Sequence, residues 1–187
     1  NWGRLVPQFV YYFSAYADLL AAGKICMGDE VNFCVPTGNF GNILAAYYAS
    51  RMGLPVGKLI CASNENNVLT DFINTGVYDR RREFRLTTSP SMDILISSNL
   101  ERMLFELCGR DMRQVKEWMD QLKADGVYCI GDELQKKLAE IMYGGYACES
   151  ACAGEIGRVF KEENYLIDPH TAVAMNVMRA YREETGD

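Results

Sequence analysis

The sequence predicts an α/β fold: an open, twisted, mostly parallel sheet with flanking helices and a helix-rich second half. Apolar runs at 31–35 and 58–63 contain residue types that suit strands, and each leads through a turn into a helix-forming segment, at 42–52 and 68–75. Strand, loop, helix and strand in this order form a right-handed βαβ unit with parallel strands. The 187 residues, 49% hydrophobic and 24% charged, suit one globular domain or one large piece of a two-domain enzyme.

The remaining elements follow from apolar residues that recur every three or four positions. Asp111, Asp132 and Asp168 each precede such a pattern as candidate N-caps, and Pro169 suits a first helical position. We expect further helices at 4–22, 92–107, after Asp111, at 132–142, 151–163 and 170–183, and further strands at 83–88 and 126–130, with 146–148 ambiguous.

Charge and hydropathy argue against two classes of partner. The net charge of −6 disfavours a broad nucleic-acid surface, and the one basic cluster, at 80–82 and 85, is interpreted as a solvated edge. No apolar run reaches the roughly 20 residues of a membrane span, and no secretion signal is recognisable. We therefore expect no nucleic acid and no membrane partner.

The cysteines predict neither a disulfide framework nor a metal site. Seven are scattered without a CxxC pair, and His170 is the only histidine. Cys148 and Cys152 lie one helical turn apart, but two more ligands would be needed for zinc, so no metal is expected. An odd number of cysteines without a secretion signal indicates a reducing compartment, and we expect the cytoplasm.

A turn of sequence Thr-Gly-Asn-Phe-Gly-Asn, at 37–42, joins the first strand to its helix. The order of elements leaves the amides of 38–42 at a helix N-terminus, where unpaired N–H groups and the helix dipole favour a phosphate. The glycines are expected to take positive φ and to let the backbone approach an anion. The alternative is a purely structural turn, because the pattern is neither a Walker A loop nor the dinucleotide-binding fingerprint.

A second polar loop, at 64–67, follows the second strand. Ligands of parallel sheets bind beyond the carboxyl ends of the strands, so this loop and 37–42 are expected to open onto the same edge. Together they predict a polar site with neutral donors. The alternative is that asparagine merely suits a turn here.

Five stretches resemble threonine synthase, a fold-type II pyridoxal phosphate (PLP) enzyme, and they occur in the order of that family. They lie at 1–4 (Asn-Trp-Gly-Arg), 37–42, 62–69, 89–94 and 165–174 and span nearly the whole chain. The resemblance implies a PLP-dependent lyase that converts O-phosphohomoserine and water to threonine and phosphate. It also implies that the PLP phosphate is held by Gly38, Asn39, Phe40, Gly41 and Asn42.

PLP chemistry also needs a Schiff-base lysine, which in this family lies upstream of the phosphate loop. The lysines of this chain are expected on polar helix faces or strand edges: Lys24, Lys58, Lys116, Lys123, Lys136, Lys137 and Lys161. We therefore expect no catalytic residue within 1–187 and no activity from this piece alone. It is interpreted as an internal fragment of the large domain, with a helical insertion at roughly 90–145.

Other residues are candidates without a defined role. The resemblance implies a site near Asn64 and Asn66, and near Ser89. Arg4 suits a bidentate contact to a substrate phosphate but equally an ordinary surface position, which is favoured. His170 suits a catalytic role or, as favoured, stabilisation of the start of the last helix.

Three other functions stay open. One is another fold-type II enzyme, of the threonine dehydratase or cysteine synthase type. Another is a non-catalytic module that binds PLP or a phosphorylated amino acid, and the last is a structural role in which the loop binds nothing. A parallel sheet cut from its neighbours leaves unpaired edges, so a homodimer is also considered.

Overall fold

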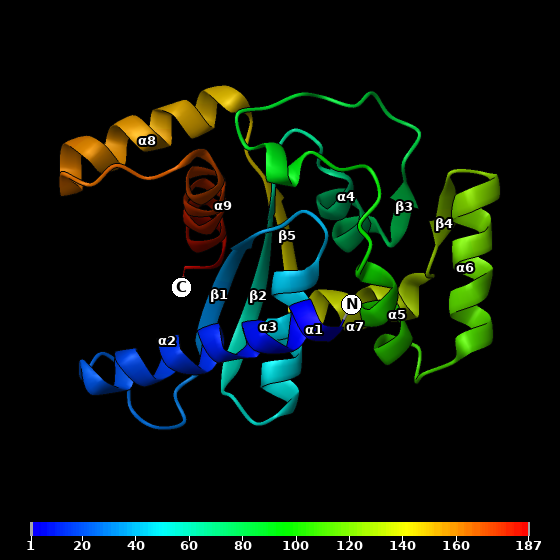
Figure 1. Cartoon of the computed structure of the whole chain (residues 1–187), viewed down its shortest axis with the longest axis horizontal. Helices are drawn as coiled ribbons and strands as arrows, with labels where there is room; N and C mark the ends of the chain where they lie inside the picture. Colours follow the sequence, from blue (N-terminus) through cyan, green and yellow to red (C-terminus); the bar gives the residue numbers. More distant parts are fainter. Residues whose placement is uncertain (1, 187) are drawn as a thin grey trace.

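Figure 1 shows the computed structural model, which describes residues 2–186; Asn1 of the first motif lies outside the described residues. The helices are α1 (Trp2–Leu5), α2 (Phe9–Ala21), α3 (Gly41–Arg51), α4 (Val68–Thr75), α5 (Leu100–Leu107), α6 (Met112–Ala124), α7 (Asp132–Ile141), α8 (Glu149–Glu163) and α9 (Pro169–Thr185). Two 3-10 turns are η1 (Val6–Gln8) and η2 (Pro90–Met92). The strands are β1 (Val31–Pro36), β2 (Val56–Ser63), β3 (Val77–Asp79), β4 (Val127–Cys129) and β5 (Met142–Tyr146).

The central sheet has three parallel strands in the order β1-β2-β5, which confirms the predicted open parallel sheet. Val35 of β1 lies opposite Cys61 of β2, and Cys61 lies opposite Gly144 of β5. The sequence prediction missed β5, because its Gly144-Gly145 pair lacks strand propensity. A Cβ at Gly145 would lie 2.6 Å from a methyl carbon of Val177, so this glycine lets α9 pack closely on β5.

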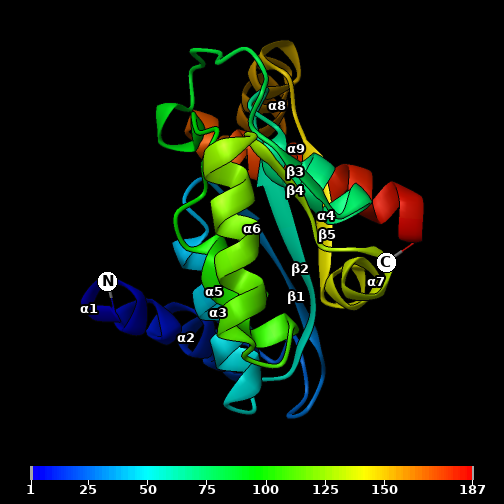
Figure 2. The same cartoon turned by 90° about the vertical axis from the view of Figure 1, so that its right-hand side faces the viewer.

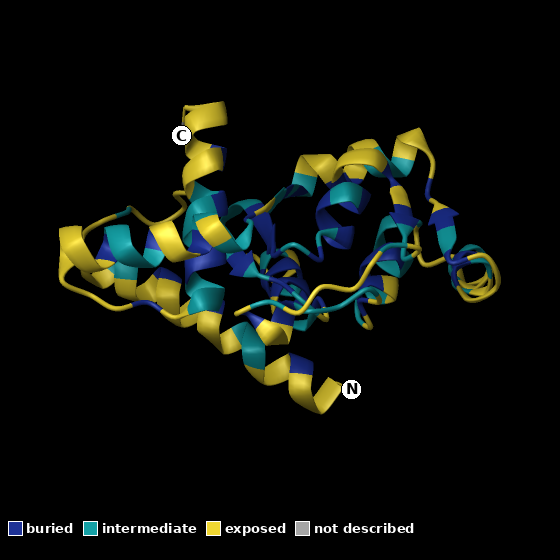
Figure 3. Ribbon diagram, turned by 90° about the horizontal axis from the view of Figure 1, so that it is seen from above, coloured by how far each residue is buried: buried dark blue, intermediate teal, exposed yellow. Residues whose placement is uncertain are grey.

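Helices cover both faces of the sheet (Figure 2). Because side chains alternate along a strand, Leu59 and Cys61 of β2 join a core cluster with α3 and α4, whereas Ile60 and Ala62 join one with α8 and α9. Seen from above, the buried positions gather around the sheet, and α6 and the ends of α2 and α9 are largely exposed (Figure 3). The buried strands thus fix the positions of the loops at their carboxyl ends.

The predicted helix at 92–107 is wrong in its first half. Only the turn η2 and α5 form, and residues 93–99 between them are not helical. Asp93, Ser97 and Asn99 instead use their side chains to bond to distant loops, which offers the backbone an alternative to a helix. The range 90–145 contains α5, α6, β4 and α7, and its interpretation as an insertion stays a prediction.

One strand prediction is wrong, and one strand was missed. Residues 83–88 form no strand, because Asn66 bonds both the amide and the carbonyl of Arg85 and holds this segment as a loop. The missed strand β3 pairs antiparallel with β4, which agrees with the strand predicted at 126–130. The predicted helix at 132–142 ends at Ile141, because Met142 begins β5.

The predicted N-caps are confirmed at two of three positions. The carboxylate of Asp111 accepts from the amides of Arg113 and Gln114, and Asp168 accepts in the same way at the start of α9. Asp132 is wrong as a cap: it is the first residue of α7, and Gly131 with φ 78° precedes it as the N-cap. Asp132 still faces the positive end of the helix dipole.

A buried carboxylate joins α8 to α9. Glu155 is 2% exposed and accepts from Arg158 of its own helix at 2.6 Å and from Arg179 of α9 at 3.1 Å. The hydrogen bond from Arg158 is the main cause that holds the pKa of Glu155 below its ordinary value of 4.5. This ion pair network holds the two helices together on one face of the sheet.

Replacing Glu155 with glutamine is expected to cost about 2 kcal/mol at neutral pH, because Arg179 loses its counter-charge and Arg158 keeps only that of Glu162. The native pKa is depressed, so the stabilisation is complete above pH 4.5 and is lost as the pH falls through the native pKa. The difference in free energy of unfolding between wild type and variant should therefore shrink on acidification. Urea unfolding across this range checks it, and a pH-independent difference would contradict it.

Ser63 carries the one buried side-chain polar atom without a hydrogen-bond partner among residues 2–186. It ends β2 and is 2% exposed. A buried hydroxyl without a partner loses its hydrogen bonds to water on folding and gains none to the protein. Ser63→Ala is therefore expected to raise the free energy of unfolding by about 1 kcal/mol. Chemical denaturation of the two proteins measures this, with Ser150→Ala on exposed α8 as the neutral control. Destabilisation by Ser63→Ala would show that the hydroxyl has a partner.

No helix among residues 2–186 is long and apolar enough to span a membrane. The same residues contain no cluster of three histidine, cysteine or acidic side chains placed to bind a metal ion.

Candidate functional site: a phosphate loop at the end of the sheet

The turn at 37–42 is held through its carbonyl groups. The hydroxyl of Ser97 donates to the carbonyl of Gly38 at 2.9 Å. The carbonyl of Asn39 accepts from the side-chain amide of Asn99 at 2.7 Å and from its backbone amide at 3.2 Å. The carbonyl groups of Gly38 and Asn39 therefore face the segment before α5 and accept their hydrogen bonds from it.

The amide groups of the same turn are left free. Within the described chain, the N–H groups of residues 38–42 donate to no protein acceptor, and they lie where α3 begins. Free amides at the start of an 11-residue helix carry partial positive charge, so the turn is suited to an anion. The sequence predicted this arrangement, and residues 37–42 are called the phosphate loop below.

The positive φ of the loop belongs to Phe40 and not to a glycine. Phe40 has φ 62° and is 1% exposed, whereas Gly38 and Gly41 are not in the positive-φ region. A left-handed conformation is costly for a residue with a side chain and tends to persist at functional sites, where the surroundings enforce it. Here the buried ring fixes the strained turn.

Gly38 is needed for close packing. A Cβ at this position would lie 2.5 Å from the carbonyl oxygen of Ser91, closer than real Cβ atoms come. A Cβ on Gly41 would meet only the side chain of Asn99, at 3.5 Å. The turn η2 therefore rests directly on the phosphate loop, and the expected reason for the first glycine, a positive φ, is wrong.

A cavity of about 210 Å³ borders the loop and brings Arg4 to it. It is lined by Arg4, Leu5, Gln8, Asn39, Gly41, Ser98 and Asn99. Arg4 forms no salt bridge within residues 2–186, so its guanidinium is free to meet an anion beside the loop. Arg4 therefore lies beside the loop, and whether it meets a phosphate there stays a prediction.

A second cavity, of about 200 Å³, lies at the edge of β1 and includes Asn42. The hydroxyl of Tyr12 also lines it and donates both to the carbonyl of Asn42, at 2.9 Å, and to its side-chain oxygen. Burial raises the pKa of Tyr12, so the hydroxyl stays a neutral donor. Because the side-chain oxygen of Asn42 accepts from Tyr12, its NH₂ group remains available to donate to a ligand.

The second polar loop joins a buried network. Asp93 accepts from the side-chain amides of Asn64 at 2.7 Å and Asn66 at 3.0 Å. Asn64 also donates to the hydroxyl of Ser89 at 3.0 Å, and Thr87 donates to Asp93 from both its amide and its hydroxyl. These residues therefore brace the segment that carries η2, and no ligand contact is needed to explain Asn64, Asn66 or Ser89.

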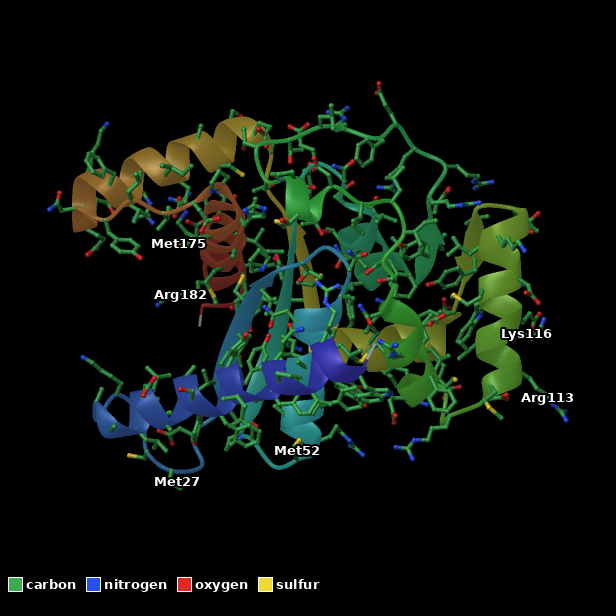
Figure 4. All side chains as sticks on the ribbon, in the orientation of Figure 1. Met27, Met52, Arg113, Lys116, Met175 and Arg182 are labelled. Carbon is green, nitrogen blue, oxygen red and sulfur yellow. The ribbon has the colours of Figure 1, made fainter. Side chains whose placement is uncertain are left out.

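No lysine lines either cavity beside the phosphate loop. Lys58 donates to the carbonyl groups at the end of α7, at 2.7 and 3.1 Å. Lys116 pairs with Asp120 on α6 and lines a cavity that contains no residue of the phosphate loop, and Figure 4 shows Arg113 directed outward from α6. These positions agree with the polar helix faces and strand edges expected for the lysines.

A larger cavity, of about 620 Å³, contains no residue of the phosphate loop. It lies between α1, α3, α5 and α6, and its lining mixes apolar side chains, such as Trp2 and Phe105, with charged ones, such as Glu106 and Arg110. The free amides of residues 38–42 and the guanidinium of Arg4 lie elsewhere, and we therefore place the candidate functional site at the phosphate loop.

The sequence missed four residues that shape the loop: Tyr12, Ser97, Ser98 and Asn99. Tyr12 lies within the predicted helix at 4–22, and the other three fell inside the predicted helix at 92–107. Their signal was the Ser-Ser-Asn run, because such side chains favour caps and turns over a helix interior.

Known proteins similar to this chain point to one family. No protein-family model matches the sequence. Threonine synthase-like 1 of Homo sapiens is 47% identical over 186 residues, which are 99% of this chain and 25% of that protein. Threonine synthase of Pseudomonas aeruginosa is 39% identical over 182 residues, which are 97% of this chain and 38% of that protein.

Solved structures agree. The PLP-bound threonine synthase of Brucella melitensis superposes with a TM-score of 0.90 and 42% identity, over 96% of this chain and 38% of its own. The threonine synthase from yeast also gives a TM-score of 0.90, with 32% identity over 100% of this chain and 39% of its own. Sequence and fold together make this chain a homologue of the threonine synthases, over 25% to 39% of the length of these proteins.

Proposed function

We propose that the protein to which this chain belongs is a threonine synthase, a PLP-dependent lyase that converts O-phosphohomoserine and water to threonine and phosphate. One observation carries the proposal: five consecutive amides, at 38–42, are free at the start of α3 while the carbonyl groups of Gly38 and Asn39 are bonded elsewhere. A phosphate monoester fits such a set of donors. The likeness to threonine synthases, one of them solved with PLP bound, supports PLP as the source of that phosphate.

PLP fits the residues present. Its phosphate would be held by the amides of 38–42 and by the NH₂ group of Asn42, which Tyr12 orients. When bound, PLP withdraws electrons from the bonds at the α-carbon of an amino acid. The residues of this chain would hold the phosphate end of PLP in place. Preorganised donors of this kind supply binding and orientation, not proton transfer.

The Schiff-base lysine is proposed to come from polypeptide outside residues 1–187. The lysines near the sheet are engaged elsewhere, as for Lys58, and none borders the phosphate loop. This chain spans only 25% to 39% of its relatives, which leaves room for that contribution. This piece alone is therefore expected to bind without turnover.

Among the described residues that line the cavity beside the phosphate loop, Arg4 is proposed to add a positive charge. Its substitution by glutamine in the full-length protein is expected to weaken PLP binding about tenfold, because a charge-assisted contact to phosphate is lost. Absorbance titration of the apoprotein with PLP measures this. Arg113→Gln on the outer face of α6 is the matched control and should leave the affinity unchanged. Equal affinities for Arg4→Gln and wild type would remove Arg4 from the site.

The proposed reaction is tested with the full-length gene product and this piece side by side, both with PLP. Phosphate release from O-phosphohomoserine by the full-length protein, with none from the piece, supports a threonine synthase whose lysine lies outside 1–187. Release of a 2-oxo acid from threonine, or use of O-acetylserine, would instead indicate the dehydratase or the cysteine synthase type. PLP binding without turnover of any of these substrates would favour the non-catalytic module.

A further inference from the structure

The turn η2 lies between the phosphate loop and the start of α9. On one side, the carbonyl oxygen of Ser91 lies 2.5 Å from the position that a Cβ on Gly38 would occupy. On the other side, the amide of Ser91 donates to Nε2 of His170 at 3.3 Å. One peptide segment thus touches both the loop and the only histidine of the chain.

His170 is itself held in one orientation. Its Nδ1 lies 3.1 Å from a carboxylate oxygen of Asp168, the residue that caps α9. Because Nε2 accepts from Ser91, the ring proton is on Nδ1 and is donated to Asp168. Hydrogen bonds from Thr171, above all from its hydroxyl, lower the pKa of Asp168 to about 2, so this acceptor stays ionised.

His170 borders neither of the two cavities beside the phosphate loop. The hydrogen bonds of its ring are instead with protein groups, Asp168 and the amide of Ser91. These contacts point to a role that acts through η2.

We infer that His170 is a positioning residue for the phosphate loop: it fixes Ser91, whose carbonyl group packs against Gly38 and keeps the loop amides aimed at the ligand. The inference rests on the proposed PLP-binding function. It assigns His170 a role beyond the stability of α9, because the capping carboxylate of Asp168 keeps its bonds to the amides of His170 and Thr171 whatever side chain stands at 170.

Two substitutions separate the bonds of the imidazole. In His170→Asn the amide nitrogen takes the place of Nδ1 and still donates to Asp168, but the acceptor for Ser91 is gone. In His170→Gln the side-chain oxygen reaches the place of Nε2 and can accept from Ser91. Asp111→Asn is the matched control, because it weakens a helix cap of the same kind at α6, far from η2.

The experiment uses the full-length protein and three readouts: the dissociation constant for PLP, the ³¹P NMR shift of the bound PLP phosphate, and Tm. His170→Asn is expected to weaken PLP binding about tenfold and to shift the ³¹P signal, and His170→Gln to restore both to near wild type. Asp111→Asn should lower Tm without changing either PLP readout.

Unchanged affinity and ³¹P shift in His170→Asn would overturn the inference while leaving the proposed function intact. Equal losses in the asparagine and glutamine variants would overturn it too, because the acceptor would then be irrelevant. Absence of PLP binding by the wild type would instead overturn the proposed function and, with it, this role for His170. If His170→Asn fails to fold, the test rests on His170→Gln: the inference requires a wild-type ³¹P shift in this variant, and a shifted signal would overturn it.

Discussion

Gly38→Ala is expected to weaken PLP binding by the full-length protein about 100-fold. The new Cβ would lie 2.5 Å from the carbonyl oxygen of Ser91, so either η2 or the phosphate loop must move. Both are backbone segments, and neither can turn aside as a flexible side chain would. Because the five free amides share one backbone, a shift of the loop misdirects them together, which explains the size of the effect. Titration of the apoprotein with PLP measures it.

The control for this substitution is Gly157→Ala on α8. A Cβ there meets nothing within 4 Å, so alanine should leave PLP binding unchanged and raise stability by about 0.5–1 kcal/mol, as expected within a helix. Wild-type PLP affinity in Gly38→Ala would contradict the close packing of η2 on the loop. Loss of affinity in both variants would mean that the measurement reports general damage.

Asp93→Ala is expected to lower the free energy of unfolding by about 3 kcal/mol and to weaken PLP binding as well. The carboxylate accepts from Asn64, Asn66 and Thr87, and its removal takes one acceptor from each of these donors at once, although Asn64 keeps its bond to Ser89 and Asn66 its bond to the carbonyl of Arg85. Asn64 and Asn66 are 1% and 3% exposed, so water cannot replace the lost bonds without opening the structure. Urea unfolding measures the loss of stability, and PLP titration measures the effect on the loop.

The matched control is Asp120→Ala, which removes an exposed carboxylate paired with Lys116 on α6. A surface pair of this kind contributes little, and the change should stay within about 0.5 kcal/mol. Similar losses for Asp93→Ala and Asp120→Ala would show that the network around Asp93 adds no more than a surface pair.

The parallel sheet and the phosphate loop could be predicted from the sequence because local patterns determine them. Strand-forming runs mark β1 and β2, and the turn at 37–42 stands where a strand must meet a helix. The family resemblance, now confirmed by the likeness to threonine synthases, pointed to the same loop. The role of its residues as PLP ligands stays a prediction.

The segment 93–99 could not be predicted, because its structure depends on partners far away in the sequence. Met103 and Leu104 lie three and four positions after Leu100, which is helical spacing, and they form α5. Asp93 and Ser97 instead bond to the loops at 64–66 and at 38, and their segment is not helical. β5 was missed for a related reason. Its two glycines are required because α4 and α9 pack closely against them on the two faces of the sheet, and the local sequence gives no sign of these neighbours.

The carbonyl bonds of the phosphate loop have a consequence for protein engineering. Ser97 and Asn99 are 59 and 60 residues away in sequence from the groups they bind. The hexapeptide at 37–42 alone, grafted onto another strand–helix junction, would therefore keep its sequence but lose the hydrogen bonds from Ser97 and Asn99 that orient its carbonyl groups. We expect a graft to bind phosphate only if it also includes the segment 89–99, so the smallest transferable unit is a pair of loops that contact each other in the fold.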